Sequence, residues 1–232
     1  SGYEIYLFSK SDLSYVNMIN TDMSSCAVME CFPINSGFIY GGLGSSSGLQ
    51  EELSDSLALY AIIVSNSSVF SCTFGISDNV LILSGMFLGS SFTFKAENQM
   101  YTYQSNIERE GIYIENTSNT AAFSLDGSLL VLGGAFSSYA SVFSVSGTTI
   151  TYIADITKSG TALNGAVNTA AFSPDGSLLV LGGEFSSYAS VFSVSGTTIT
   201  YIADITKSGT ALNGAVNTAA FSPDGSLLVL GG

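Results

Sequence analysis

Hydrophobic and polar positions alternate with a period of two along much of the second half of the chain. In the segment 149–156, isoleucine, tyrosine and alanine alternate with threonine and aspartate, as in a β-strand that has one face buried. The segment Leu129–Leu132 is apolar at every position, which is typical of a strand covered on both faces. β-Branched and aromatic residues dominate these segments, and none shows the apolar stripe of a helix. The pattern predicts an all-β protein.

The chain also repeats itself with a period of 49 residues. The segment 119–167 returns as 168–216 with two differences, Leu125 against Pro174 and Ala135 against Glu184, and a third copy covers 217–232. The divergent first half keeps the same frame, in which a phenylalanine is followed ten or eleven residues later by a glycine. The pairs are Phe32 and Gly42, Phe74 and Gly85, Phe123 and Gly134, Phe172 and Gly183, and Phe221 and Gly232. Five such units predict a repeat architecture.

Turn residues divide each unit into short strands. Ser173-Pro174-Asp175-Gly176 fits a tight hairpin turn, because proline fixes φ at the second place and glycine allows a positive φ. We expect four antiparallel strands in each unit, which in the second copy cover Asn168–Ser173, Ser177–Phe185, Tyr188–Ser195 and Thr198–Thr206, before a loop at Lys207–Gly214. One such sheet cannot bury both of its faces. Sheets repeated around an axis cover one another, which is the arrangement of a β-propeller.

Two motifs carry a resemblance to known propeller families. The sequence AFSPDGSLL at Ala171–Leu179, with an aromatic-rich third strand after it, resembles the first two strands of WD-repeat-like propellers. The segments LLVLGG at Leu178–Gly183 and FIYGG at Phe38–Gly42 resemble kelch repeats, in which apolar residues precede a diglycine. The chain has no tryptophan, so the tryptophans of both families are missing, as is the Gly-His pair of WD repeats. The resemblance implies a β-propeller fold without implying a particular activity.

The repeat frame also predicts the blades. Four complete blades are expected at 24–66, 67–118, 119–167 and 168–216, of which the first is irregular between Gly44 and Ser56. Residues 1–21 resemble a third and a fourth strand, whereas residues 217–232 repeat a first and a second strand. Combined, these terminal strands would complete a fifth blade and close the ring. The alternative is that the chain is a fragment of a larger propeller or repeat array.

Composition excludes several classes of function. The chain has 5 Lys and Arg against 18 Asp and Glu, a net charge of −13, so it lacks the cationic surface that nucleic acid requires. Its longest strongly apolar run, Leu57–Val64, is much shorter than the roughly 20 residues of a spanning helix, so we expect no membrane insertion. The absence of histidine removes the commonest general base and zinc ligand. We therefore expect no cofactor and no metal site.

Five aspartates occupy repeated positions. Asp126, Asp175 and Asp224 share one hairpin position, where aspartate is a common turn former, so we expect them to be structural. Asp155 and Asp204 end the fourth strand, where a charge is expected to solvate the edge of the blade. Near-identical copies present the same side chains twice, whereas a catalytic site usually needs different groups that converge from different elements. We therefore expect the protein not to be an enzyme.

A few other residues are candidate sites. Asn66 and Asn116 lie in glycosylation sequons, which require a secretory route to be used. Repeated aromatic residues beside a Ser-Ser loop fit packing between blades, or a surface that stacks against sugars or peptides; they are Phe136, Tyr139, Phe185 and Tyr188. The three cysteines fit either buried thiols or a single disulfide, which would join Cys72 to Cys26 or to Cys31.

These observations predict a noncatalytic β-propeller scaffold. We expect it to be a structural or assembly component of an extracellular surface, a filament or a virion, acting through protein partners or self-assembly. The alternative is a recognition module that binds glycan or protein. A carboxylate-based hydrolase is a more remote alternative, because it would need two acidic groups roughly 5–9 Å apart in the central channel.

Overall fold

The structure is a computed structural model that describes the second half of the chain most fully. From Gln104 to Gly232 it describes complete residues, apart from 115–116, 136–138, 186 and the side chain of Tyr113. Before Gln104 it describes only strands, and only their backbone, except at Thr73. The sites predicted at Asn66, Asn116 and Phe136, and the thiol state of the three cysteines, lie outside the described residues. In the described part, no helix is long and apolar enough to cross a membrane.

Four complete antiparallel sheets follow one another along the chain, and in each the strands pair in sequence order. The first contains β3 (Val28–Cys31), β4 (Gly37–Gly41), β5 (Ser47–Leu53) and β6 (Ser56–Ile63). The second contains β7 (Val69–Gly75), β8 (Val80–Gly85), β9 (Ser91–Glu97) and β10 (Met100–Asn106). The third contains β13 (Ser118–Phe123), β14 (Leu129–Gly134), β15 (Ala140–Ser146) and β16 (Thr149–Asp155). The fourth contains β19 (Val167–Phe172), β20 (Leu178–Gly183), β21 (Ala189–Ser195) and β22 (Thr198–Asp204).

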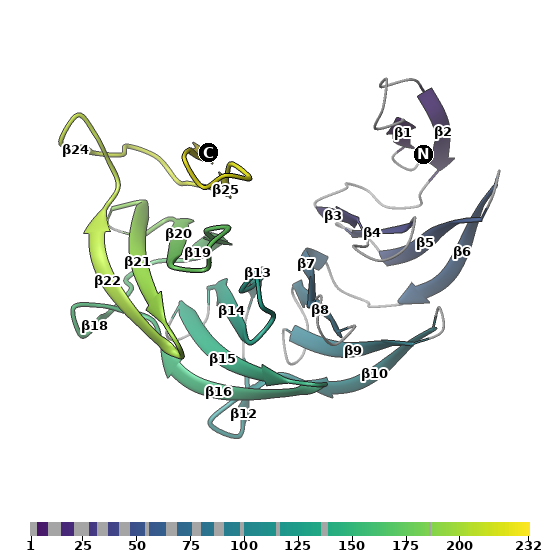
Figure 1. Ribbon diagram of the computed structural model, residues 1–232, viewed down its shortest axis with the longest axis horizontal. Coiled ribbons are helices and arrows are strands. Elements are labelled where there is room, and N and C mark those ends of the chain that lie inside the picture. Colours follow the sequence, from purple (N-terminus) through teal and green to yellow (C-terminus); the bar gives the residue numbers. More distant parts are fainter. Residues whose placement is uncertain are drawn as a thin grey trace.

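These sheets are arranged as blades around an arc (Figure 1). The first strands β7, β13 and β19 lie on the inside and are neighbours, while the fourth strands β10, β16 and β22 lie on the outside. The four strands expected in each unit are therefore present, with ends within a few residues of the predicted ones. The irregular region of the first blade contains its third strand, β5.

The terminal strands do not form the fifth blade that we predicted. β1 (Glu4–Phe8) pairs only with β2 (Tyr15–Asn20), and β25 (Thr218–Phe221) pairs only with β26 (Leu228–Gly231), so each pair is a separate two-stranded sheet. Figure 1 shows the reason: the two ends of the chain lie on opposite sides of the open arc. Four complete blades do not turn the chain through enough of a circle to bring these sheets together.

Short hairpins connect the later blades. They are β11 (Glu108–Arg109) with β12 (Ile112–Tyr113), β17 (Thr157–Lys158) with β18 (Thr161–Ala162), and β23 (Thr206–Lys207) with β24 (Thr210–Ala211). Each turns through two residues with positive φ, such as Ser208 at 53° and Gly209 at 79°. Consecutive positive φ values favour a two-residue hairpin turn. The loop predicted at Lys207–Gly214 therefore begins as a hairpin.

The core lies between the blades. Leu129 and Val131 of β14 pack in a cluster with Leu179, Phe185 and Phe192 of the following blade. The alternate residues of β14, Leu130 and Leu132, pack in a second cluster with Ile107, Ile114 and Phe143. All four β14 leucine and valine side chains are at most 3% exposed. The strand is thus covered on both faces, as its continuous apolar run predicts, and each blade depends on its neighbours for burial.

Candidate functional site

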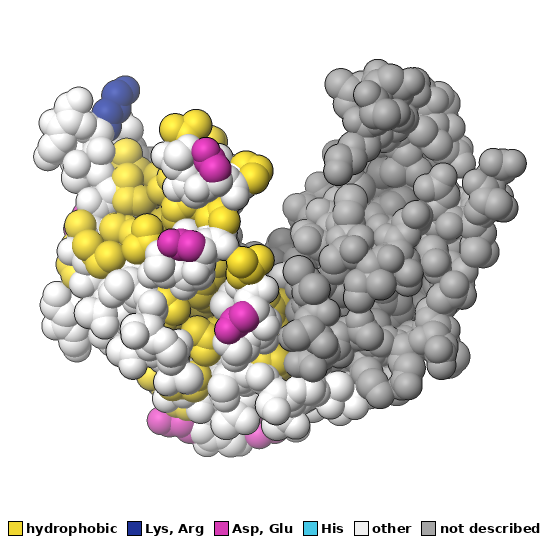
Figure 2. Space-filling model, in the orientation of Figure 1, with side chains coloured by type: hydrophobic (Ala, Val, Ile, Leu, Met, Phe, Trp, Pro, Cys, Tyr) yellow, Lys and Arg dark blue, Asp and Glu magenta, His cyan; other side chains and the backbone are white. Residues whose placement is uncertain are grey.

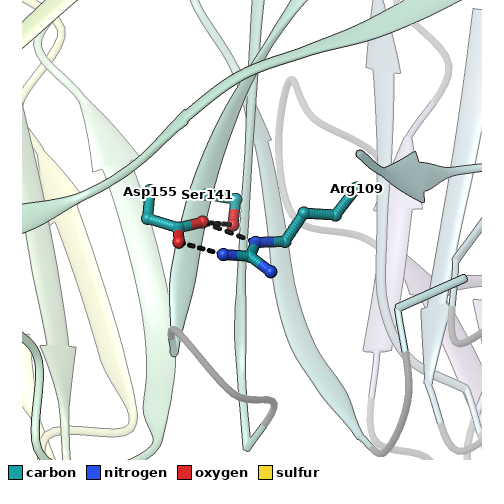
Figure 3. A network of polar contacts seen from close by, with 3 residues as sticks. All are labelled: Arg109, Ser141 and Asp155. Carbon is teal, nitrogen blue, oxygen red and sulfur yellow. Dashed lines mark hydrogen bonds and ion pairs between the residues drawn. The ribbon is translucent and has the colours of Figure 1, made fainter. Parts of the chain in front are cut away.

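An ion pair joins each of the first two connecting hairpins to the blade that follows it. Arg109 of β11 reaches Asp155 at the end of β16 (Figure 3). Its Nε donates to Oδ1 of Asp155 at 2.8 Å, and its Nη2 makes a second contact to Oδ2. The hydroxyl of Ser141 in β15 also donates to Oδ1, at 2.8 Å. The guanidinium carbon lies 5.5 Å from the ring centroid of Tyr152. We call this set of four residues the first brace.

The next blade contains an equivalent set, the second brace, one repeat further along the chain. Lys158 replaces the arginine, and its Nζ lies 2.6 Å from Oδ1 of Asp204 and 5.4 Å from the ring centroid of Tyr201. Ser190 donates to the same carboxylate at 2.8 Å. Lys158 also donates to the hydroxyl of Ser187 at 2.9 Å. Lysine and arginine therefore fill the same position between blades. Arg109 contacts both carboxylate oxygens of Asp155, whereas Lys158 contacts one oxygen of Asp204 and the hydroxyl of Ser187.

The braces hold their charges in the ionised forms. The hydrogen bond that Arg109 donates to Asp155 raises the pKa of Arg109 above its already high ordinary value. Partial burial, which is the largest single influence on Asp204, raises its pKa, but hydrogen bonds from Lys158 and three hydroxyls together lower it below the ordinary value. Partial burial and the neighbouring Asp155 raise the pKa of Tyr152. A cation and an anion fixed against each other in this way have structural roles, because neither is available as an acid or a base.

The second brace contains a serine close to a lysine, which is the arrangement of some hydrolytic nucleophiles. Ser187 is 4% exposed, and Ser190, 3.2 Å from it, is fully buried. Lys158 donates to Ser187 and pairs with Asp204, so in this arrangement it is a donor to the hydroxyl and does not accept its proton. The geometry therefore fits a buried polar contact between two blades better than it fits a catalytic pair.

The hairpin aspartates are bonded within their own turns. Ser173 donates from its hydroxyl to Oδ1 of Asp175 at 2.5 Å, and the backbone amide of Ser177 donates to the same oxygen at 3.0 Å. These hydrogen bonds lower the pKa of Asp175 to about 2, and the equivalent bonds from Ser222 and Ser226 do the same for Asp224. The pKa of Asp126 is also lowered, chiefly by Ser124. All three aspartates stabilise turns, as their position in the sequence predicts.

An asparagine ladder joins the first strands of three successive units. Nδ2 of Asn119 donates to Oδ1 of Asn168 at 2.9 Å, and Nδ2 of Asn168 donates to Oδ1 of Asn217 at 2.9 Å. The backbone amide of Ala219 also donates to the hydroxyl of Thr169, at 3.2 Å. Because the amide of Asn168 donates to one neighbour and accepts from the other, the ladder fixes the alignment of neighbouring blades at the inner side of the arc.

The structure separates the aromatic residues for which we predicted either packing between blades or a binding surface. Phe185 is 1% exposed and belongs to the core cluster between two blades, so it fits the packing alternative and not the surface. Tyr139 and Tyr188 are half-buried, and Tyr139 packs against that same cluster. Both tyrosines have positive φ, 65° and 61°, which is rare for a bulky side chain. Their backbone carbonyls accept hydrogen bonds from Gly134 and Gly183, which shows that they close the turn between the second and third strands.

An open cleft of about 460 Å³ lies where hairpin turns of the third and fourth blades meet. Its lining includes Leu125 and Asp126 from one blade and Asp175, Val194 and Gly196 from the next. Leu125 is 62% exposed. The two aspartates in this cleft are the turn formers described above, so they already have hydrogen-bond partners within their own hairpins.

The braces were not predicted from the sequence, although a signal was present. The chain has five cations, and three of them, Arg109, Lys158 and Lys207, are spaced by the 49-residue period. We expected Asp155 and Asp204 to solvate the edge of a blade, which is wrong because both pair with these cations between blades. The partners are separated by 46 residues in the chain, so no local pattern indicates the contact.

Comparison with known proteins defines the fold. No protein-family model matches the sequence, and no curated protein matches it. A candidate 6-phosphogluconolactonase from Bacteroides uniformis matches with a TM-score of 0.77 at 14% identity, over 97% of this chain and 69% of its own. A protein from Lactobacillus plantarum matches with a TM-score of 0.76 at 14% identity, over 99% and 70%. The periplasmic gluconolactonase of Pseudomonas aeruginosa matches with a TM-score of 0.71 at 14% identity, over 97% and 68%.

The chain therefore has a β-propeller fold, built of four-stranded antiparallel blades. The two lactonase-type structures that it matches are seven-bladed propellers. The matched region covers about seven-tenths of each of those chains. At 14% identity the similarity concerns the fold alone, because propellers with the same architecture have unrelated activities.

Proposed function

We propose that this protein is a noncatalytic β-propeller scaffold whose repeated blades serve assembly. One observation carries the proposal: all five aspartates between Gln104 and Gly232 have structural partners. Three stabilise hairpin turns and two complete the braces between blades. In this part of the chain, every aspartate therefore helps to hold the fold together.

Repetition supports the same proposal. The two braces place equivalent side chains one blade apart, and the asparagine ladder extends through three units. Such an array gives each blade the same neighbour contacts, so its stability grows with each unit that is added. That property suits a structural component of an extracellular surface, a filament or a virion. It does not by itself produce the converging, dissimilar groups of an active site.

We further propose that the blades belong to a ring larger than five blades. The match to seven-bladed structures over about seven-tenths of their length supports this size, and so does the open arc in Figure 1. The fifth blade that we predicted from the terminal strands would require a tighter turn between blades than the structure has. The remaining blades can come from the same polypeptide or from a second one.

A combined assay of assembly, binding and hydrolysis tests the function. We expect the purified chain to self-associate reversibly in sedimentation velocity, to leave sugar lactones unhydrolysed, and to bind no member of a glycan array. Specific glycan binding by a monomer would instead support the recognition module. Lactone hydrolysis that survives further purification, and that is lost in an acidic-residue variant outside the turns and braces, would contradict the scaffold proposal.

A further inference from the structure

The open cleft between the third and fourth blades has an apolar lining that neither the turns nor the braces explain. Both blades that form it are complete, and each of its lining residues is described. Leu129 belongs to the core cluster between the blades and Val194 packs against it, so the cleft opens onto that cluster. Leu125 also lines the cleft, with 62% of its surface exposed. The volume of about 460 Å³ lies within the range of roughly 300–1,000 Å³ that is usual for ligand pockets.

Two carboxylates line this cleft, one from each blade. Asp126 and Asp175 are exposed, and neither pairs with a cation of the described residues. In each of them Oδ2 accepts a hydrogen bond from one described hydroxyl, that of Ser128 or of Ser177, at 2.8 Å. A carboxylate oxygen has two lone pairs, so each Oδ2 can accept a further hydrogen bond. The bonds within the turns therefore fix two negative charges in the cleft and leave both able to bind a cation.

The described cations lie at the opposite ends of the strands. Arg109 and Lys158 pair with the aspartates that end the fourth strands, and Lys207 lies in β23, after the end of β22. Gly196, which lines the cleft, lies instead in the turn just before β22 begins. In Figure 2, acidic side chains lie beside hydrophobic ones on the visible face of the described blades, and Lys or Arg atoms appear there only at the upper left edge. The negative charge of the cleft is therefore free to attract a cation from another molecule, and the net charge of −13 strengthens that attraction.

The space in the cleft depends on one of the two differences between the 49-residue copies. Leu125 in the first copy corresponds to Pro174 in the second. At the next pair of hairpins, a Cβ built on Gly225 would lie 3.5 Å from Cδ of Pro174. A Cβ built on Gly176, which lines the cleft with Leu125, would meet no atom within 4 Å. Leucine thus leaves open a space that proline narrows.

We propose that this cleft binds a lysine or arginine side chain on an exposed segment of a basic partner protein. The aliphatic stem of such a side chain packs on Leu125 and Val194, and its cationic head reaches the two aspartates. The two glycines in the lining, Gly176 and Gly196, allow the backbone of the partner to approach closely. This inference goes beyond the scaffold proposal, because it concerns a partner of opposite charge and not contacts between blades of this protein.

The chemistry of the lining favours an organic cation over a metal ion. Apart from the two aspartates and Ser128, the cleft is lined by apolar residues and glycines. Ca²⁺ takes about six to eight oxygen ligands, most of them from carboxylates, carbonyls and water. A side chain that combines an apolar stem with a charged head matches both parts of this lining.

Fluorescence anisotropy with the whole chain and a labelled peptide tests the proposal. The probe is a peptide of glycine and serine that contains two arginines, and its counterpart contains citrulline, which keeps the shape of arginine without the charge. We expect the arginine peptide to bind at least about tenfold more tightly than the citrulline peptide, because two ion pairs are lost together. We also expect the affinity to fall as salt is added, since both carboxylates are exposed. This comparison uses the wild-type chain and does not depend on the folding of any variant.

Four variants locate the binding. Asp126→Asn and Asp175→Asn should each weaken binding by about threefold or more, and asparagine keeps the hairpin because it is also a common turn former. Leu125→Pro, which introduces the residue of the second copy, should weaken binding by about threefold or more while both charges remain. Glu184→Gln is the matched control: it removes the same charge from an exposed residue that follows the far end of β20, where the first copy has alanine. We expect it to leave binding unchanged.

Three results overturn the proposal. The first is a wild-type chain that binds neither peptide, or binds both equally. The second is a loss of binding in Glu184→Gln equal to that in the aspartate variants, which would show non-specific attraction to an acidic chain. The third is tighter binding of spermidine or Ca²⁺ than of the arginine peptide, with displacement of the peptide, which would assign the cleft to a small cation. None of these results changes the self-association expected of the scaffold, so the failures of the two proposals are distinguishable.

Discussion

Ser118 offers a sharp test of how the blades pack. It is fully buried at the start of β13, and among the residues that the structure describes its hydroxyl has no hydrogen-bond partner. The equivalent positions in the next two units are Val167 and Val216, which are 0% and 5% exposed. Val167 packs on Gly133, where an added Cβ would lie 2.6 Å from its Cγ1 atom. The position equivalent to Gly133 in the preceding blade is Ser84, in β8. In the sequence, Ser118 thus stands at the position of the valine of this pair, and Ser84 stands at the position of its glycine.

We predict that Ser118→Val stabilises the protein only when Ser84→Gly accompanies it. Removing an unpartnered buried hydroxyl raises the free energy of unfolding by about 1–3 kcal/mol. The extra methyl group buried in the core gains roughly 0.8 kcal/mol more. Without space at position 84, overpacking costs about 1–3 kcal/mol and cancels this gain. In the double variant only the cost of a strand glycine remains, about 0.5–1 kcal/mol. We therefore expect a net gain of about 1–3 kcal/mol in the free energy of unfolding, or roughly 2–12 °C in Tm at this chain length.

Calorimetry and urea unfolding of the four variants in this cycle measure the effect. The predicted signature is a coupling free energy of about 1 kcal/mol or more between positions 84 and 118. Val167→Ser is the mirror test: it creates a cavity and an unpartnered hydroxyl together, and should cost about 2–4 kcal/mol. Equal effects of Ser118→Val in both backgrounds would refute the reasoning, because they would show that the two positions do not share space.

Three further predictions concern turns, braces and close approaches. Gly183→Ala should lower the free energy of unfolding, measured in urea, by about 1–3 kcal/mol, because a Cβ there would lie 2.1 Å from the carbonyl oxygen of Ala166. Gly214→Ala is the control: its added Cβ meets no atom within 4 Å, so it should change the free energy of unfolding by less than about 0.5 kcal/mol. Arg109→Ala should lower the free energy of unfolding by about 1–2 kcal/mol, and Arg109→Lys should lower it by less than about 1 kcal/mol, since lysine already fills the second brace. Equal losses in the two variants would show that the charge contributes nothing. The folded-state pKa of Asp175 is about 2, below its ordinary 3.8, so the stabilisation that Asp175 provides is present above pH 3.8 and lost as the pH falls through 2. We therefore expect the difference in Tm between the wild type and Asp175→Asn to shrink over that range. A constant difference would contradict the turn assignment.

Much of the blade could be predicted because the signals are local. Alternation at period two gives strands, and a proline or glycine at a fixed place gives a turn, so the strands of the second copy were located to within a few residues. The role of Asp175 followed from the same kind of signal, since its partners Ser173 and Ser177 lie two residues away. Phe185 could not be placed in this way, because an aromatic residue beside a loop is equally compatible with a surface and with the core.

Local signals were enough to specify an all-β chain of repeated four-stranded units, because strand alternation and turn chemistry act between residues that are near one another in the chain. The contact between Arg109 and Asp155, 46 residues away, and the separation of the terminal strands became known only from the folded structure. Contacts of this kind depend on the angle between successive blades. That angle results from the packing of large side chains such as Phe192 between whole sheets, and no short stretch of sequence specifies it.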